Sequence, residues 1–231
     1  MDIILIPGFW LDASSWNDVV PLLDEQGHRT HPVTLPGLES VDADRSRIGL
    51  REHIDAVVRL VDGLDEPVVL VGHSGGGAIA YGVADRRPDR VARIVYVDAG
   101  PLADGQAIND ALPVVDGEIP LPEWEEFDEA DLVDLDDELR GAFRARAVPQ
   151  PAAVANDPLV LHDERRYDVP ITVIACEFPS SVLQEYLASD APFTRELSRV
   201  RQVDYVDLPT GHWPQFTKPV QLGQAIAAAI R

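Results

Sequence analysis

A serine stands between glycines directly after an apolar run, in the segment Gly72-His73-Ser74-Gly75-Gly76. The preceding residues 67–71 are typical of a short buried strand, and residues 75–84 predict a helix of small side chains. Strand, G-x-S-x-G and helix together form a nucleophile elbow, a sharp turn that exposes the serine hydroxyl. A glycine-rich turn that happens to contain serine is the alternative, because short motifs also occur by chance.

Length and composition predict one α/β domain. The chain has 231 residues, of which 45% are hydrophobic, enough for a full core. Forty acidic residues against 19 basic ones give a formal charge of −21, which argues against nucleic acid as a partner. We expect no membrane partner, because no stretch is apolar for the ~18 residues that a span needs.

Few features bear on compartment and assembly. A strand is expected directly after Met1, with no basic segment or cleavable signal pattern, which favours a cytoplasmic protein. Cys176 is the single cysteine, so an internal disulfide framework is excluded. The oligomeric state, including a homodimer, stays open.

Apolar runs alternate with helical patterns, which predicts a mostly parallel sheet of about six strands flanked by helices. Strands are expected near residues 2–7, 30–35, 67–72, 92–98, 170–176 and 203–208. Helices are expected near residues 13–26, 46–63, 75–86 and 217–231.

The region 101–168 interrupts this rhythm. Its prolines prevent one long helix, and its acidic middle, 123–147, is helix-capable and carries aromatic residues that could be buried. We therefore expect a core formed by residues 1–100 and 169–231, with 101–168 as a cap insertion over the active site. A disordered acidic loop is the alternative.

A serine hydroxyl is a weak nucleophile and needs a general base held by a third group. His212 is the best candidate, because it follows the last expected strand in a loop that can reach the edge of the sheet. His73 adjoins the serine, but its side chain should point away from that of Ser74. Surface or packing roles fit the other histidines better: His28, His31, His53 and His162.

Two carboxylates compete for the role of the acid that orients the histidine. The chain order around such an elbow should be Ser, acid, His, with the acid after the strand expected at 170–176. Only Glu177 stands there, close to the strand end. Asp98 ends the strand expected beside the nucleophile strand, so it could reach His212 from a shifted position. We favour Asp98 over Glu177, although an aspartate here can simply cap a turn.

Two backbone N–H groups should stabilise the developing oxyanion. Gly75 supplies one at a helix N-terminus, and Phe9 supplies the other after a turn that Gly8 allows. An apolar substrate pocket is expected from three tryptophans: Trp10, Trp124 and Trp213. We expect no metal and no cofactor, because no His, Asp or Glu cluster has the spacing of a known ligand set.

Taken in order, these motifs resemble an α/β-hydrolase over nearly the whole chain. The resemblance rests on Gly8-Phe9-Trp10, the elbow at 72–76, Asp98 and the segment Thr-Gly-His-Trp-Pro at 210–214. Within that family the chain is similar to the small serine-esterase branch that includes plant methylesterases and hydroxynitrile lyases. That branch places a tryptophan a few residues after the oxyanion donor, here Trp16.

Three features depart from the pattern of that branch. Pro7 stands where a histidine usually precedes the glycine, which removes a supporting hydrogen bond. The usual acid after the strand expected at 170–176 is absent. Asp98 occupies the position of the acid in haloalkane dehalogenases, whose nucleophile is an aspartate, whereas this chain has Ser74.

The favoured hypothesis is a carboxylesterase that acts on a small apolar ester through an acyl-enzyme. A C–C bond hydrolase or lyase on the same site is one alternative. Cyanohydrin cleavage is disfavoured, because the lyases that the chain resembles place a lysine beside the catalytic histidine, where this chain has Trp213. A non-catalytic ligand-binding member of the fold is the other alternative, and a lost acid would be its first sign.

Overall fold

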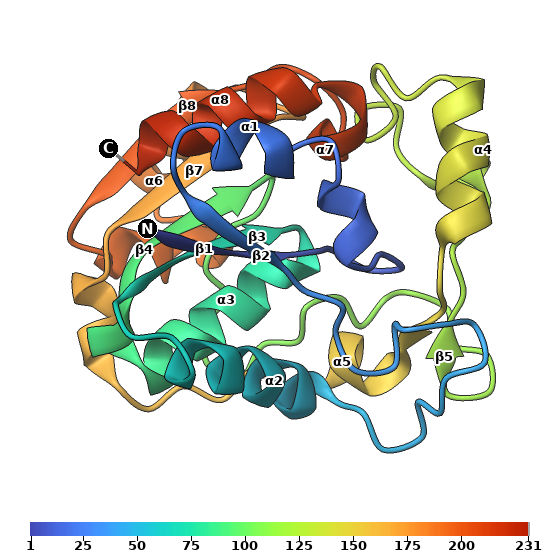
Figure 1. Cartoon of the computed structure of the whole chain (residues 1–231), viewed down its shortest axis with the longest axis horizontal. Coiled ribbons are helices and arrows are strands. Elements are labelled where there is room, and N and C mark those ends of the chain that lie inside the picture. Colours follow the sequence, from blue (N-terminus) through green and yellow to red (C-terminus); the bar gives the residue numbers. More distant parts are fainter. Residues whose placement is uncertain (231) are drawn as a thin grey trace.

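A six-stranded parallel sheet forms the centre of the molecule in a computed structural model, which describes residues 1–230 (Figure 1). The strands run β2-β1-β3-β4-β7-β8 across the sheet, and every neighbouring pair is parallel. Their bounds are β1 Asp2–Ile6, β2 Arg29–Pro32, β3 Val68–His73, β4 Val91–Val97, β7 Ile171–Ala175 and β8 Val203–Asp207. The expected α/β fold is confirmed.

Helices cover both faces of this sheet (Figure 1). Helices α2 and α3 pack against each other on one face, and α1 and α8 contact each other on the opposite face. The helix bounds are α1 Val20–Asp24, α2 Leu50–Asp62, α3 Gly75–Arg86, α4 Asp137–Arg146, α5 Ala152–Asn156, α6 Ser180–Ala188, α7 Pro214–Thr217 and α8 Pro219–Ala229. Short 3-10 helices are η1 Ala13–Trp16, η2 Pro88–Arg90, η3 Trp124–Glu126, η4 Glu164–Asp168, η5 Pro192–Thr194 and η6 Leu197–Arg199.

The central strands are buried on both faces, which explains why they read as continuous apolar runs. Every residue of β1, β3 and β7 is buried. Ile4 and Leu70 pack in the cluster under α2 and α3, whereas their neighbours Ile3 and Val71 pack in the cluster under α1 and α8. The strands thereby fix the positions of the loops at their carboxyl ends.

Several helices differ from the expected ranges where proline intervenes. The expected helix 13–26 is divided into η1 and α1, with Pro21 in the first turn of α1. The expected helix 217–231 is preceded by the short α7, and Pro219 starts α8. Proline is common in the first turn of a helix, where its missing N–H group leaves no hydrogen bond unmade. It also restricts the backbone of the residue before it, which ends a preceding helix.

Residues 101–168 connect β4 to β7, and their helices α4 and α5 lie on the right-hand side of Figure 1. They contain a two-stranded antiparallel pair, β5 (Glu118–Ile119) and β6 (Gln150–Pro151). This region, called the cap below, also contains η3, α4, α5 and η4. Within residues 1–230, the helices are all too short or too polar to cross a membrane.

Candidate active site

Ser74 lies in a strained turn between β3 and α3. Its backbone has φ 52° and ψ −125°, outside the regions that side-chain-bearing residues normally occupy. A Cβ atom on Gly72 would lie 2.7 Å from the carbonyl oxygen of Gly76, and one on Gly76 would lie 2.6 Å from that of Pro7. The turn therefore requires glycine two residues before and two residues after Ser74, as expected of a nucleophile elbow.

The His212 side chain is held by two carboxylates at the same nitrogen. Its Nδ1 lies 2.7 Å from Asp98 Oδ2 and 2.7 Å from Glu177 Oε1. Asp98 has φ 47°, and its other oxygen accepts hydrogen bonds from the backbone N–H groups of Cys176 at 3.0 Å and Glu177 at 3.3 Å. The two acids expected from the sequence thus both reach His212, at Nδ1.

The pKa values distinguish the two carboxyl groups. Burial opposes ionisation of Asp98, but hydrogen bonds, first of all from His212, outweigh it and lower the pKa of Asp98. Burial raises the pKa of Glu177, and the charge of Asp98 adds to this effect. The pKa of His212 is lowered by burial but raised more strongly by its hydrogen bonds to both carboxylates. Asp98 is therefore the ionised partner, and Glu177 takes up a proton more readily.

His73 holds the backbone of His212 from the core side. Fully buried, it donates from Nε2 to the carbonyl oxygen of His212 at 2.7 Å. Its Nδ1 therefore lacks a proton and accepts from Gln215 Nε2 at 3.3 Å. Burial lowers the pKa of His73 to about 3, so it stays neutral. Sequence reasoning placed His73 away from Ser74 but missed this contact, for which the sequence carries no signal.

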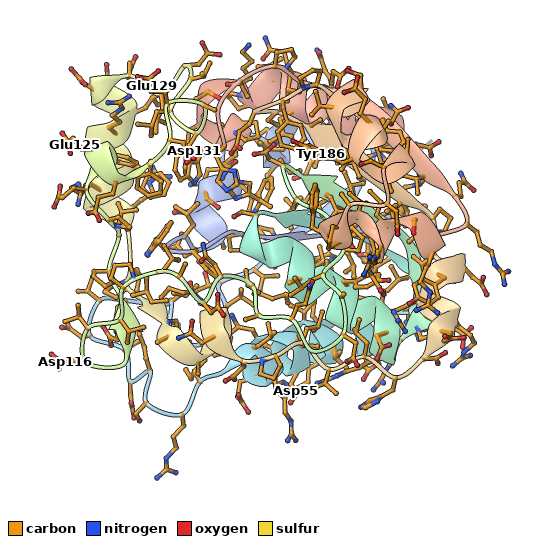
Figure 2. All side chains as sticks on the ribbon, turned by 180° about the vertical axis from the view of Figure 1, so that it is seen from behind. Asp55, Asp116, Glu125, Glu129, Asp131 and Tyr186 are labelled. Atoms are coloured by element: carbon orange, nitrogen blue, oxygen red, sulfur yellow. The ribbon has the colours of Figure 1, made fainter. Side chains whose placement is uncertain are left out.

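The cap holds the same loop from the opposite side. The His212 N–H group donates to the carbonyl oxygen of Asp131 at 2.8 Å, and Gly211 N–H donates to that of Val133 at 3.0 Å. A Cβ atom on Gly211 would lie 2.6 Å from Val133 O, so this approach requires glycine. In Figure 2, Glu125 and Glu129 lie at the outer edge of the cap, with Asp131 nearer the core.

The loop after β1 passes close to the elbow. A Cβ atom on Gly8 would lie 2.7 Å from His73 Nδ1, and one on Gly75 would lie 2.6 Å from the ring of Phe9. As the first residue of α3, Gly75 has no intrahelical acceptor for its N–H group. Phe9, Ser74 and Gly75 line one cleft. The two expected amide donors therefore border the serine.

This cleft has a volume of about 650 Å³ and lies between the core and the cap. Trp10 and Trp213 line it, as expected, together with Phe127. Trp10 is tied to the cap, since its Nε1 donates to Ile119 O at 3.0 Å. Trp124, also expected in the pocket, is not among the described residues that line the cleft. It packs edge-to-face against Trp213 at 6.0 Å and supports the wall from behind.

His212, Asp98 and Glu177 are also groups that could bind a metal ion. Their ligand atoms lie within 4.8 Å of one another, a cluster that the sequence spacing did not reveal. Each carboxylate oxygen, however, lies 2.7 Å from Nδ1, which is a hydrogen-bond distance. Two ligands about 2.0–2.2 Å from a tetrahedral ion would lie farther apart than this. The arrangement fits an oriented histidine better than a metal centre.

Comparisons with known proteins agree with this geometry. Residues 3–225 match the model of the alpha/beta hydrolase family. The chain is 30% identical over 112 residues to a carbendazim hydrolyzing esterase from Nocardioides sp. (strain SG-4G), covering 48% of this chain and 46% of that protein. It is 35% identical over 100 residues to methylesterase 8 of Arabidopsis thaliana, covering 41% and 36%. The chain thus matches less than half the length of these curated relatives.

A solved structure shows the same fold over the whole chain. An extracellular α/β-hydrolase from a Paenibacillus species superposes with a TM-score of 0.79 at 22% identity, covering 99% of this chain and 98% of that one. The resemblance to the branch that includes plant methylesterases is confirmed. Because the family model matches residues 3–225, which is most of the chain, this chain belongs to the α/β-hydrolase family.

Proposed function

We propose that the protein is a serine carboxylesterase that hydrolyses small neutral esters through an acyl-enzyme. One observation carries the proposal. Ser74 stands in a strained elbow and lines the same cleft as His212, whose Nδ1 is hydrogen-bonded to Asp98 at 2.7 Å. That unit combines a nucleophile, a base and an orienting acid.

The proposed reaction has two steps. His212 Nε2 takes the proton of Ser74 while the serine Oγ attacks the acyl carbon. His212 then gives that proton to the departing alcohol. Asp98 stabilises the imidazolium at Nδ1, while the N–H groups of Gly75 and Phe9 stabilise the oxyanion. Water, deprotonated by His212, then attacks the acyl-enzyme. The acid is released, and the proton returns to Ser74.

The chemistry of the cleft supports a neutral ester as substrate. Aromatic rings of Trp10, Phe127 and Trp213 provide apolar surface. Carboxylates of the cap stand in the same lining: Glu126, Asp128 and Asp131. Among the described residues that line the cleft there is no lysine or arginine to bind an anion. An ester with a separate carboxylate group would meet repulsion there.

Two alternatives receive less support from this site. Lys218 donates to the carbonyl oxygen of Pro209 and lies 3.2 Å from Asp134 Oδ2, away from the cleft, so it is not placed as in a cyanohydrin lyase. The missing acid after β7 is what favours a non-catalytic binding protein. The hydrogen bond between Asp98 and His212 supports the esterase instead, because it supplies an acid partner for the histidine.

Ester turnover tests the proposal. The wild-type protein is expected to hydrolyse p-nitrophenyl acetate or butyrate, and Ser74→Ala is expected to lower kcat by roughly 10⁴-fold or more. A Ser74→Ala protein that retained turnover would falsify the proposal. Cyanide release from an aromatic cyanohydrin, without ester hydrolysis, would instead favour the lyase.

A further inference from the structure

A second cavity lies behind the catalytic histidine. It has a volume of about 240 Å³ and is bordered by β7, α6, η5 and η6. It shares five lining residues with the main cleft: Asp98, Ala99, Gly100, Glu177 and His212. Ser74 and Gly75 line the main cleft only. The second cavity is therefore separate from the position where an ester carbon would react.

Most of the wall of this cavity is apolar. Val173 and Leu197 are buried at its base, with exposed fractions of 3% and 4%, and Leu183 of α6 borders it. Phe178 and Phe193 line it while remaining 42% and 57% exposed, so they stand at its opening. An apolar cavity of roughly 150 Å³ is enough to bind benzene. The space therefore suits one aromatic ring with a substituent.

The remaining polar groups favour a hydrogen-bond donor on the occupant. The Thr194 hydroxyl already donates to the carbonyl oxygen of Ala191 at 2.9 Å. Asp98 and Glu177 then provide the carboxylate acceptors, with Glu177 sharing a single Nδ1–H group with Asp98. The described lining includes neither lysine nor arginine. An anion would be rejected, whereas a neutral hydroxyl can donate to Glu177.

We propose that this cavity binds a small neutral aromatic alcohol or phenol, with its ring between Leu183 and Phe193 and its hydroxyl donating to Glu177. If the proposed function holds, binding also affects catalysis. A Glu177 carboxylate that accepts the hydroxyl of the ligand leaves Asp98 as the main acceptor of the His212 Nδ1–H group. Alcohols and phenols are products of ester hydrolysis, so the site links this product class to the base.

Calorimetric titration of the Ser74→Ala protein with benzyl alcohol tests the proposal without turnover. We expect saturable binding with a dissociation constant in the millimolar range or below. Leu183→Trp, which fills the cavity, should weaken it at least tenfold. Gln184→Trp is the matched control, because Gln184 is on the same helix, exposed and outside the lining, and it should bind as before. Benzoate, which adds a charge, should bind at least tenfold more weakly.

A second variant keeps the test informative if Leu183→Trp misfolds. Phe193→Ala removes an exposed ring and should also weaken binding severalfold. Unchanged binding in the two variants would place the ligand in the main cleft and overturn the proposal, as would equal binding of benzoate or no saturable binding. Binding that fits the expectation while the wild type fails to hydrolyse esters would overturn the proposed function alone.

Discussion

The sheet and the cap both hold the candidate site, but in different ways. Ser74 and Asp98 directly follow β3 and β4, and both residues have positive φ angles. The cap contributes backbone carbonyls instead, through Asp131 and Val133 on the loop of His212. The strand ends therefore hold Ser74 and Asp98, whereas the cap and His73 together hold the backbone of His212.

The strongest test on the sheet side compares the two acids. Asp98→Asn should lower kcat by roughly 10³-fold or more, because Asp98 is the ionised partner that holds the imidazolium. Glu177→Gln should lower kcat less than tenfold at its optimum pH. Ester turnover at saturating substrate measures both variants. The reverse ranking would make Glu177 the orienting acid.

The cap side is tested at Gly211. Gly211→Ala forces the loop of His212 away from Val133 O of the cap and should lower kcat/KM by about 10–100-fold, because misplacement of a reacting group by about 1 Å costs this much. Gly141→Ala, in α4 of the cap, is the matched control, since its added Cβ has no neighbour within 4 Å. Circular dichroism checks that both variants fold. Equal activity in the two variants would show that the cap contact does not position His212.

The shared Nδ1 contact predicts the pH dependence. The two carboxylates raise the pKa of His212, and catalysis needs its neutral form, so kcat/KM should fall as the pH drops through that raised pKa. Glu177→Gln removes one carboxylate and should move this acid limb to lower pH by about one unit or more. Profiles of kcat/KM against pH compare the two proteins. An acid limb that stays in place or moves upward contradicts this account of Glu177.

The smallest expected effect comes from the charges of the cap. Replacing Glu126 and Asp128 by Gln and Asn should raise kcat/KM for a carboxylate-bearing ester by a few-fold at low salt, because both side chains are exposed and screened. A neutral ester of the same size is the control substrate and should change little. The same gain for both substrates would mean that charge repulsion does not select the substrate.

The two regions also differ in how far the sequence predicts them. Continuous apolar runs predict the buried strands β1, β3 and β7, and Gly72 and Gly76 predict the turn at Ser74, because these signals are local. The support of His212 by His73, Asp131 and Val133 is not predictable, since it depends on contacts between distant segments. The sequence also presents Asp98 and Glu177 as competitors, whereas folding brings both to one nitrogen.

The most direct test of the central claim is covalent labelling of the folded wild-type protein with an organophosphonate fluoride, followed by peptide mass spectrometry. If Ser74, His212 and the oxyanion amides form one working site, the probe should add once, on the peptide that contains Ser74, and Ser74→Ala should abolish the adduct. A folded protein that gives no adduct, or one labelled at another residue, would contradict the account.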